Sequence, residues 1–181
     1  MRMGLAILAV MALAAQPAFA QVKSKASPVD SALTALELCE AFARGGDTLV
    51  TDAIAAGWDA YDQDAESPFV KSYVASRELA GLGWGDLFSL VETYPSSVFG
   101  YCRIDFIEIE GDGKPVIDAI AALDRYEGEV VDQEGGHYGS FSGGDSLLLA
   151  HWDQDGFVIQ LTTLTPRADD ATPPVEPAAS E

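Results

Sequence analysis

Hydrophobic residues recur at helical spacing in the segment that begins near residue 28. Leu33, Leu36 and Cys39 fall on one side of a helix with about 3.6 residues per turn. The preceding Ser27-Pro28-Val29-Asp30 is typical of a helix start, because serine caps the first turn and proline suits the first helical position. Gly45-Gly46 marks an end, since glycine readily adopts the conformation that follows a helix. We therefore predict a helix between these two signals, with Cys39 on its apolar face.

A second, shorter helix is predicted directly after this one. Asp47 is its expected cap, and the helix should run to about Ala56, where Gly57 ends it. Residues 59–68 (DAYDQDAESP) follow. They are acidic and contain little material for a core, so we expect them to form a loop.

The hydrophobic period then changes from helical to alternating. Three segments rich in aromatic and β-branched residues are predicted as strands: 70–79, 84–94 and 97–110. In the third segment Cys102, Ile104 and Phe106 share one face. Arg103 and Asp105 share the other, which indicates a wetter side. Cys102 should therefore point toward the core.

A turn and a third helix separate this block from a second block of strands. Gly111-Asp112-Gly113-Lys114-Pro115 is a strong turn signal, and residues 116–123 show helical spacing. The strands of the second block are predicted at 129–133, 138–142, 146–152 and 157–165. Asp153-Gln154-Asp155-Gly156 lies between the last two and suits a tight hairpin turn.

The order of these elements predicts the fold class. Runs of strands that do not alternate one-for-one with helices favour an antiparallel α+β arrangement. We expect a twisted sheet of about six or seven strands, with two N-terminal helices and one mid-chain helix packed on one face. The domain should span residues 28–165. Residues 166–181 are rich in proline, alanine and acid, which predicts a disordered tail.

The first twenty residues have the layout of a secretory signal peptide. Arg2 precedes an apolar run, and a small-residue site follows, which predicts cleavage between Ala20 and Gln21. The apolar run is too short to span a membrane, which favours a signal peptide over an anchor. No later stretch is long and apolar enough to cross a membrane, so no membrane insertion is expected after cleavage. Residues 21–27 (QVKSKAS) are polar and should form a loose lead-in. The mature protein is thus expected to be periplasmic or secreted.

The chain contains two cysteines, Cys39 and Cys102, and the predicted export bears on their chemistry. In an oxidising compartment a single pair of cysteines indicates a disulfide. Both are predicted on inward faces, one on the first helix and one on a strand. A catalytic pair would more often be a close C-x-x-C. We therefore expect a structural bridge between the helix layer and the sheet.

The charge of the chain restricts its partners. Ten lysines and arginines stand against 29 aspartates and glutamates, a net charge of −19. Such a chain is repelled by nucleic acid and by anionic membrane surfaces, because binding either requires basic residues. A protein partner or a cationic ligand remains compatible with the charge. Solubility alone also explains an acidic surface.

Residues that could carry chemistry are few. His137 and His151, with Asp153 and Asp155 nearby, could form a metal site, although their spacing matches no compact ligand motif. The glycine-rich stretch 135–144 lacks the lysine of a phosphate-binding loop. It also has phenylalanine where a G-x-S-x-G elbow needs serine. No cofactor is expected.

A second set of candidates is a hydrolytic triad, for which the sequence contains the residue types but no motif that fixes their geometry. Ser140 or Ser142, either histidine and Asp145 would make a hydrolytic triad if the fold brought them together. The three tryptophans could offer a stacking platform, but each lies beside a predicted core element: Trp58, Trp84 and Trp152.

These observations favour a binding protein over an enzyme. We expect an exported envelope protein that acts as a non-catalytic binding or interaction module. The alternative is a periplasmic hydrolase or metal-binding protein that uses His137 and His151 with a nearby aspartate. That alternative requires the imidazoles to converge in one pocket.

Overall fold

The computed structural model describes residues 27–133 and 135–167, which form three helices and eight strands. The helices are α1 (Pro28–Arg44), α2 (Leu49–Ala55) and α3 (Lys114–Ala121). The first four strands are β1 (Asp59–Gln63), β2 (Lys71–Leu79), β3 (Gly83–Thr93) and β4 (Ser97–Phe106). The second four are β5 (Glu127–Gln133), β6 (Gly136–Gly143), β7 (Ser146–Asp153) and β8 (Gly156–Pro166). The predicted leader, residues 1–20, and nearly all of the predicted tail lie outside the described residues.

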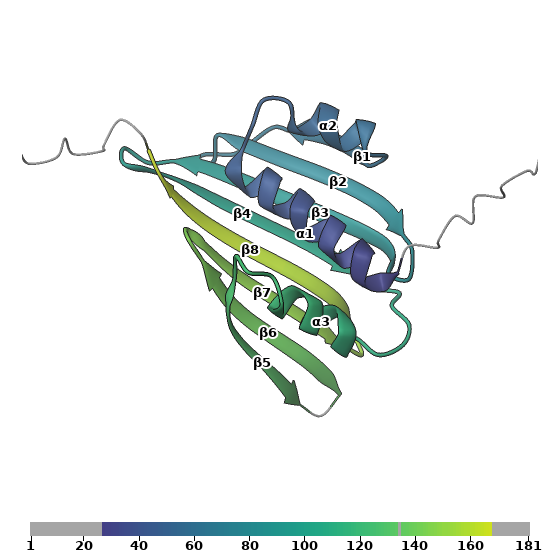
Figure 1. Ribbon diagram of the computed structural model, residues 1–181. Coiled ribbons are helices and arrows are strands. Elements are labelled where there is room, and N and C mark those ends of the chain that lie inside the picture. The colour runs from purple at the N-terminus through teal and green to yellow at the C-terminus, as the bar shows by residue number, and fades with distance from the viewer. Residues whose placement is uncertain (1–26, 134, 168–181) are drawn as a thin grey trace, which may run out of the picture.

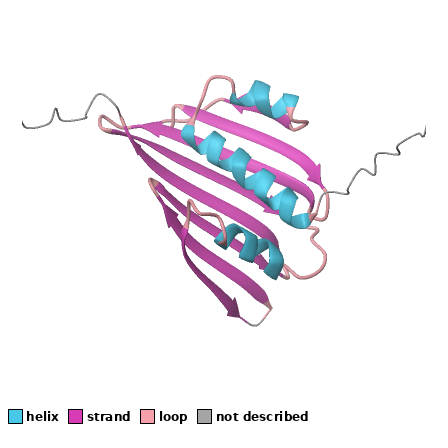
Figure 2. Ribbon diagram, viewed as in Figure 1, coloured by secondary structure: helices cyan, strands magenta, loops and turns pink. Residues whose placement is uncertain are grey.

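All eight strands belong to one antiparallel sheet in the order β1-β2-β3-β4-β8-β7-β6-β5. The helices lie on one face of this twisted sheet, and no helix of the described residues lies over the other face (Figure 1, Figure 2). The predicted α+β class and the placement of the helices are therefore confirmed. The sheet has eight strands rather than six or seven.

The strand order divides the chain into two halves of similar design. In each half, helical structure precedes a meander of four strands, and the last strands of the halves, β4 and β8, pair at the centre. Helix α1 packs over the first half and α3 over the second (Figure 1). No residue-level repeat accompanies this similarity. What the halves share is the order of their elements and the alternation of buried positions.

Helix α1 begins as its sequence predicts. The Ser27 hydroxyl accepts a hydrogen bond from the Asp30 backbone N–H, and the Asp30 carboxylate accepts one from the Ser27 N–H, each at 3.1 Å. This reciprocal cap satisfies two of the backbone donors that a helix start leaves open. The apolar face then buries Leu36, Cys39 and Phe42 completely. The core thus lies between α1 and the centre of the sheet.

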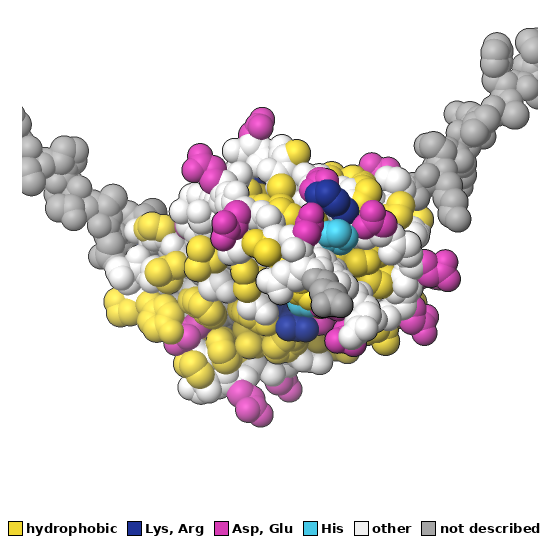
Figure 3. Space-filling model, turned by 90° about the horizontal axis from the view of Figure 1, so that it is seen from below, with side chains coloured by type: hydrophobic (Ala, Val, Ile, Leu, Met, Phe, Trp, Pro, Cys, Tyr) yellow, Lys and Arg dark blue, Asp and Glu magenta, His cyan; other side chains and the backbone are white. Residues whose placement is uncertain are grey.

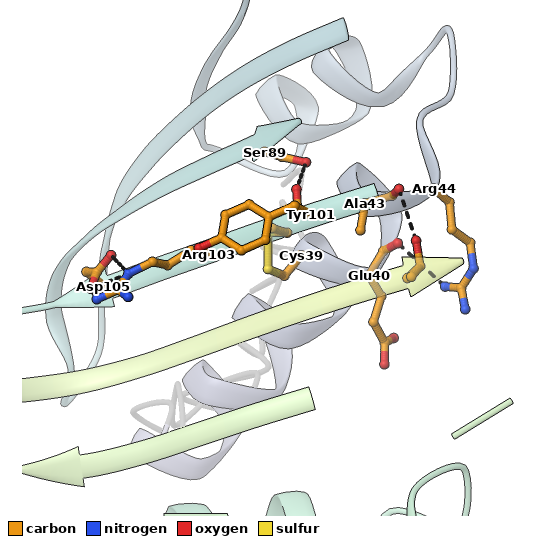
Figure 4. Close-up of a disulfide and its surroundings, with 10 residues drawn as sticks. Cys39, Glu40, Ala43, Arg44, Ser89, Tyr101, Arg103 and Asp105 are labelled. Carbon is orange, nitrogen blue, oxygen red and sulfur yellow. Dashed lines mark hydrogen bonds and ion pairs between the residues drawn. A yellow bond between two sulfur atoms is a disulfide. The ribbon is translucent and has the colours of Figure 1, made fainter. Parts of the chain in front are cut away.

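Cys39 and Cys102 form a disulfide that joins α1 to β4, with their Cα atoms 5.5 Å apart (Figure 4). Both residues are fully buried. The predicted bridge between the helix layer and the sheet is confirmed.

The predicted loop at 59–68 is partly wrong, because its first residues form β1. This strand pairs with β2 at the edge of the sheet, and only Ala60 is buried. An edge strand has one neighbour, so its remaining side chains can be polar, and charge on an edge discourages pairing between molecules. An acidic composition therefore does not exclude a strand at this position.

The predicted cap of the second helix is also wrong. Thr48 occupies the N-cap position and makes no side-chain cap hydrogen bond. Asp47 instead accepts a hydrogen bond of 2.9 Å from Lys71 Nζ on β2, an ion pair that lowers the pKa of Asp47. The contact with a distant lysine replaces the local cap.

Candidate functional site

The candidate site is the side of the sheet on which the described part of the chain places no helix, and we call it the open face. Strand register places alternate residues of every strand on it, opposite to the positions that pack under the helices. Large apolar side chains remain exposed there: Tyr61, Trp84, Phe88, Val131, Leu147, Leu149 and Leu164. Leu147 is 63% exposed and Leu164 is 54% exposed. Seen from below in Figure 3, hydrophobic side chains gather over the lower part of the view, which is the back of Figure 1.

Acidic side chains surround these apolar positions. They include Glu78 on β2, Asp86 and Glu92 on β3, and Glu127 and Glu129 on β5. Among the described strands, Arg103 is the one lysine or arginine whose position falls on the open face. It binds the Asp105 carboxylate at 2.6 Å, which raises the pKa of Arg103 (Figure 4). The one strong base that the described strands place on this face is thus already paired.

The tryptophans separate into two groups. Trp58 and Trp152 are buried under the helices, as a core assignment predicts. Trp84 is 48% exposed at the edge of the open face, where its indole N–H donates to Asp86 at 3.1 Å. The core assignment of Trp84 is wrong.

The two candidate histidines point to opposite faces of the sheet. His137 lies on the helix side of β6, with Nδ1 2.8 Å from Asp132 and Nε2 3.0 Å from Asp112. His151 lies on the open face, where it stacks on Tyr138 with ring centroids 5.9 Å apart. A site that needs both imidazoles in one pocket is therefore not formed.

The candidate metal ligands do not converge either. Asp153 accepts a hydrogen bond from the Asp155 backbone N–H at 2.9 Å, and Tyr138 donates to its other oxygen at 3.2 Å. Asp153 thus serves the β7–β8 turn. Within residues 27–133 and 135–167, no group of three or more histidine, cysteine or acidic side chains is placed to hold a metal ion.

Of the two serine candidates, Ser142 has a structural partner and not a catalytic one. Ser142 donates to the Glu127 carbonyl across the β5–β6 pair at 3.5 Å. Asp145, just before β7, accepts hydrogen bonds from the Thr165 and Ser146 hydroxyls, and these two contacts, the Thr165 one first, lower the pKa of Asp145. Neither histidine forms a hydrogen bond with a serine hydroxyl in the described structure. The candidate Ser-His-Asp triad is therefore not assembled.

His137 lines a cleft of about 310 Å³ between the turn before α3 and the β5–β6 and β7–β8 turns. Gly113 and Trp152 line the same cleft. The Gly113 backbone lies so close to the Trp152 side chain that a Cβ atom at this position would come within 1.9 Å of Trp152 Cγ. Hydrogen bonds to Asp132 and then Asp112 raise the pKa of His137, and the first of these contacts lowers the pKa of Asp132. Lys114 Nζ is also 3.8 Å from Asp132. His137 on β6 thus connects Asp132 on β5 with Asp112 in the turn before α3.

The contacts of His137 with Asp132 and Asp112 predict that the free energy of unfolding depends on pH. Because the pKa of His137 is raised on folding, its contribution is complete below the ordinary value of 6.5 and is lost as pH rises through the raised value. In urea unfolding at pH 5.5 and pH 8, His137→Gln should reduce the difference between the two midpoints. His151→Gln, which removes an imidazole without a carboxylate contact, should leave that difference unchanged. The same difference between the midpoints at pH 5.5 and pH 8 in both variants would contradict a stabilising contact of His137 with the two aspartates.

Comparison with protein-family models, with curated proteins and with solved structures gives no match for this chain. In the part of the chain that the structure describes, no helix has the length and apolar character to cross a membrane.

Proposed function

We propose that this is an exported, non-catalytic binding protein that engages a basic protein or cationic ligand through the open face. The exposed apolar side chains of that face carry the proposal. They form two groups, one around Phe88 and one around Leu147 and Leu149, with Arg103 and Gln160 between Phe88 and Leu149 in the register. Soluble proteins rarely leave large apolar patches in water unless they bind something. Burial of a side chain such as Phe88 or Leu147 contributes about 1.5–3 kcal/mol.

The charge of the face supports a basic partner. Glu127 and Glu129 stand beside Leu147 and Leu149 across β6, and no lysine or arginine in the described structure pairs with them. A partner with lysine or arginine around an apolar patch would meet both features at once, and such complementarity also accelerates association.

The disulfide and the leader support export. A bridge such as Cys39–Cys102 forms and persists in oxidising compartments, and the leader at residues 1–20 predicts delivery to one. We therefore propose that the mature protein acts in the periplasm or outside the cell.

Site-specific photo-crosslinking in the producing cell tests this proposal. A photoreactive phenylalanine analogue at Phe88 should form an adduct with a basic protein or peptide. The same analogue at Ile54 should not, although Ile54 is 55% exposed and Phe88 is 42% exposed. Ile54 lies on α2, away from the open face. Adduct yield should also fall in high salt, because exposed charge pairs are screened.

Equal adduct yields at Phe88 and Ile54, or none at Phe88, would contradict the proposal. Adducts only between copies of this chain would instead identify the open face as a self-association surface.

A further inference from the structure

A groove runs along β6 on the open face. Two adjoining hollows of about 300 and 450 Å³ form it, and they share Glu129 and Ser140. The groove exists because β6 carries small residues, Ser140 and Ser142, between bulkier side chains on β5 and β7.

Strand register gives the groove a repeating cross-section. Glu129, Ser140 and Leu149 lie opposite one another on β5, β6 and β7. Two residues along, Glu127, Ser142 and Leu147 repeat the same order. We call each set of three a rung. The groove thus has an acidic wall on β5, a serine floor on β6 and a leucine wall on β7.

The next position along the strands ends this repeat. Val131, Tyr138 and His151 lie opposite one another there, and the stacked rings of Tyr138 and His151 replace the small floor. The two Glu-Ser-Leu rungs therefore form one part of the groove, and the smaller hollow continues past them along Val131, Tyr138 and His151.

We infer that this groove binds an extended peptide segment in which basic and apolar residues alternate. Successive rungs are two residues apart, about 6.8 Å, which is the distance between every second residue of an extended chain. A segment lying along β6 would direct alternate side chains to opposite walls. Lysine or arginine would meet the glutamates, and aliphatic side chains would meet the leucines. This inference rests on the proposed function and names its ligand.

The charge of the groove disfavours two other occupants. The C-terminal residues 168–181 contain four acids and no lysine or arginine, so they would bring like charge to the acidic wall. Two copies that met through this groove would bury Glu127 and Glu129 without a cation, which costs free energy unless each charge is paired. A basic segment satisfies the same carboxylates.

Binding of a fluorescent six-residue peptide, Lys-Leu-Lys-Val-Lys-Leu, to the disulfide-bonded mature protein tests the inference. The alternating peptide should bind by fluorescence anisotropy and shift the NMR amide signals of Ser140, Ser142 and Leu149. A peptide of the same composition in blocks, Lys-Lys-Lys-Leu-Val-Leu, should bind about tenfold more weakly, because it cannot match both walls at once.

Variants of the groove residues distinguish binding in the groove from a general attraction of the basic peptide to the acidic protein. Replacing both glutamates (Glu127→Gln with Glu129→Gln) should weaken the alternating peptide about tenfold, since it removes both charge pairs. Replacing two exposed acids elsewhere (Glu37→Gln with Asp124→Asn) removes the same charge and should have little effect. Ser140→Phe, at an exposed position, should fill the groove and abolish binding while the circular dichroism spectrum is preserved.

Three results would overturn the inference: equal binding of the two peptides, equal effects of the two charge variants, or full binding to Ser140→Phe. Self-association that requires Lys23 and Lys25 would also overturn it, by assigning the groove to the N-terminal segment of a second copy. If the peptide fails but adducts at Phe88 persist, the open face still binds a partner and only the groove is wrong. Loss of the adducts as well removes the proposed function.

Discussion

Replacing Cys39 and Cys102 together with alanine should lower the free energy of unfolding by about 4 kcal/mol in the chain-entropy model of disulfides. The two residues are 63 positions apart, so the bridge removes a long loop from the unfolded ensemble. A loss of this size is a large fraction of the net stability of a typical domain. Thermal denaturation followed by circular dichroism should show a midpoint lower by about 10 °C.

Reduction of the wild-type protein provides the matched control. Reduced wild type keeps both buried sulfur atoms and loses only the cross-link, so it separates chain entropy from packing between α1 and β4. It should unfold close to the double variant. A reduced protein as stable as the oxidised one would contradict a stabilising role for the bridge.

The elements around this bridge could be predicted because their signals are local. The capping residues of α1 and the alternation along β4 place Cys39 and Cys102 on inward faces without any knowledge of the sheet. The strand order could not be predicted, since β4 and β8 pair across more than fifty residues and no local pattern specifies that partner.

The open face left a sequence signal that the core assignment of Trp84 did not use. On β3, Leu87 and Val91 are buried, whereas Trp84 and Phe88 occupy the opposite face. Leu147-Leu148-Leu149 is likewise apolar at consecutive positions, so one face alone cannot account for it. A strand with apolar residues at both parities should have two apolar faces. In this sheet the helices of the described residues cover only one of those faces.

The separation of the histidines could not be predicted, because it depends on register. His137 and Tyr138 are neighbours in the chain, yet they point to opposite faces, and His151 pairs opposite Tyr138. A one-residue change in register would reverse this arrangement. Nearness in sequence therefore gave no information on whether the imidazoles converge.

Gly100→Ala should have an effect of similar size to loss of the bridge. Gly100 lies on β4 where α1 crosses the sheet, and a Cβ atom there would come within 1.7 Å of the Ala43 carbonyl oxygen and 2.6 Å of the Thr163 hydroxyl. The nearest of these atoms belongs to backbone, so the helix itself must move. The variant should lose at least about 3 kcal/mol of stability in urea unfolding, at the upper end of overpacking effects. Gly46→Ala is the control, because its Cβ would meet only the flexible Leu49 side chain at 3.3 Å. Equal stabilities of the two variants would show that α1 does not need this close approach to β4.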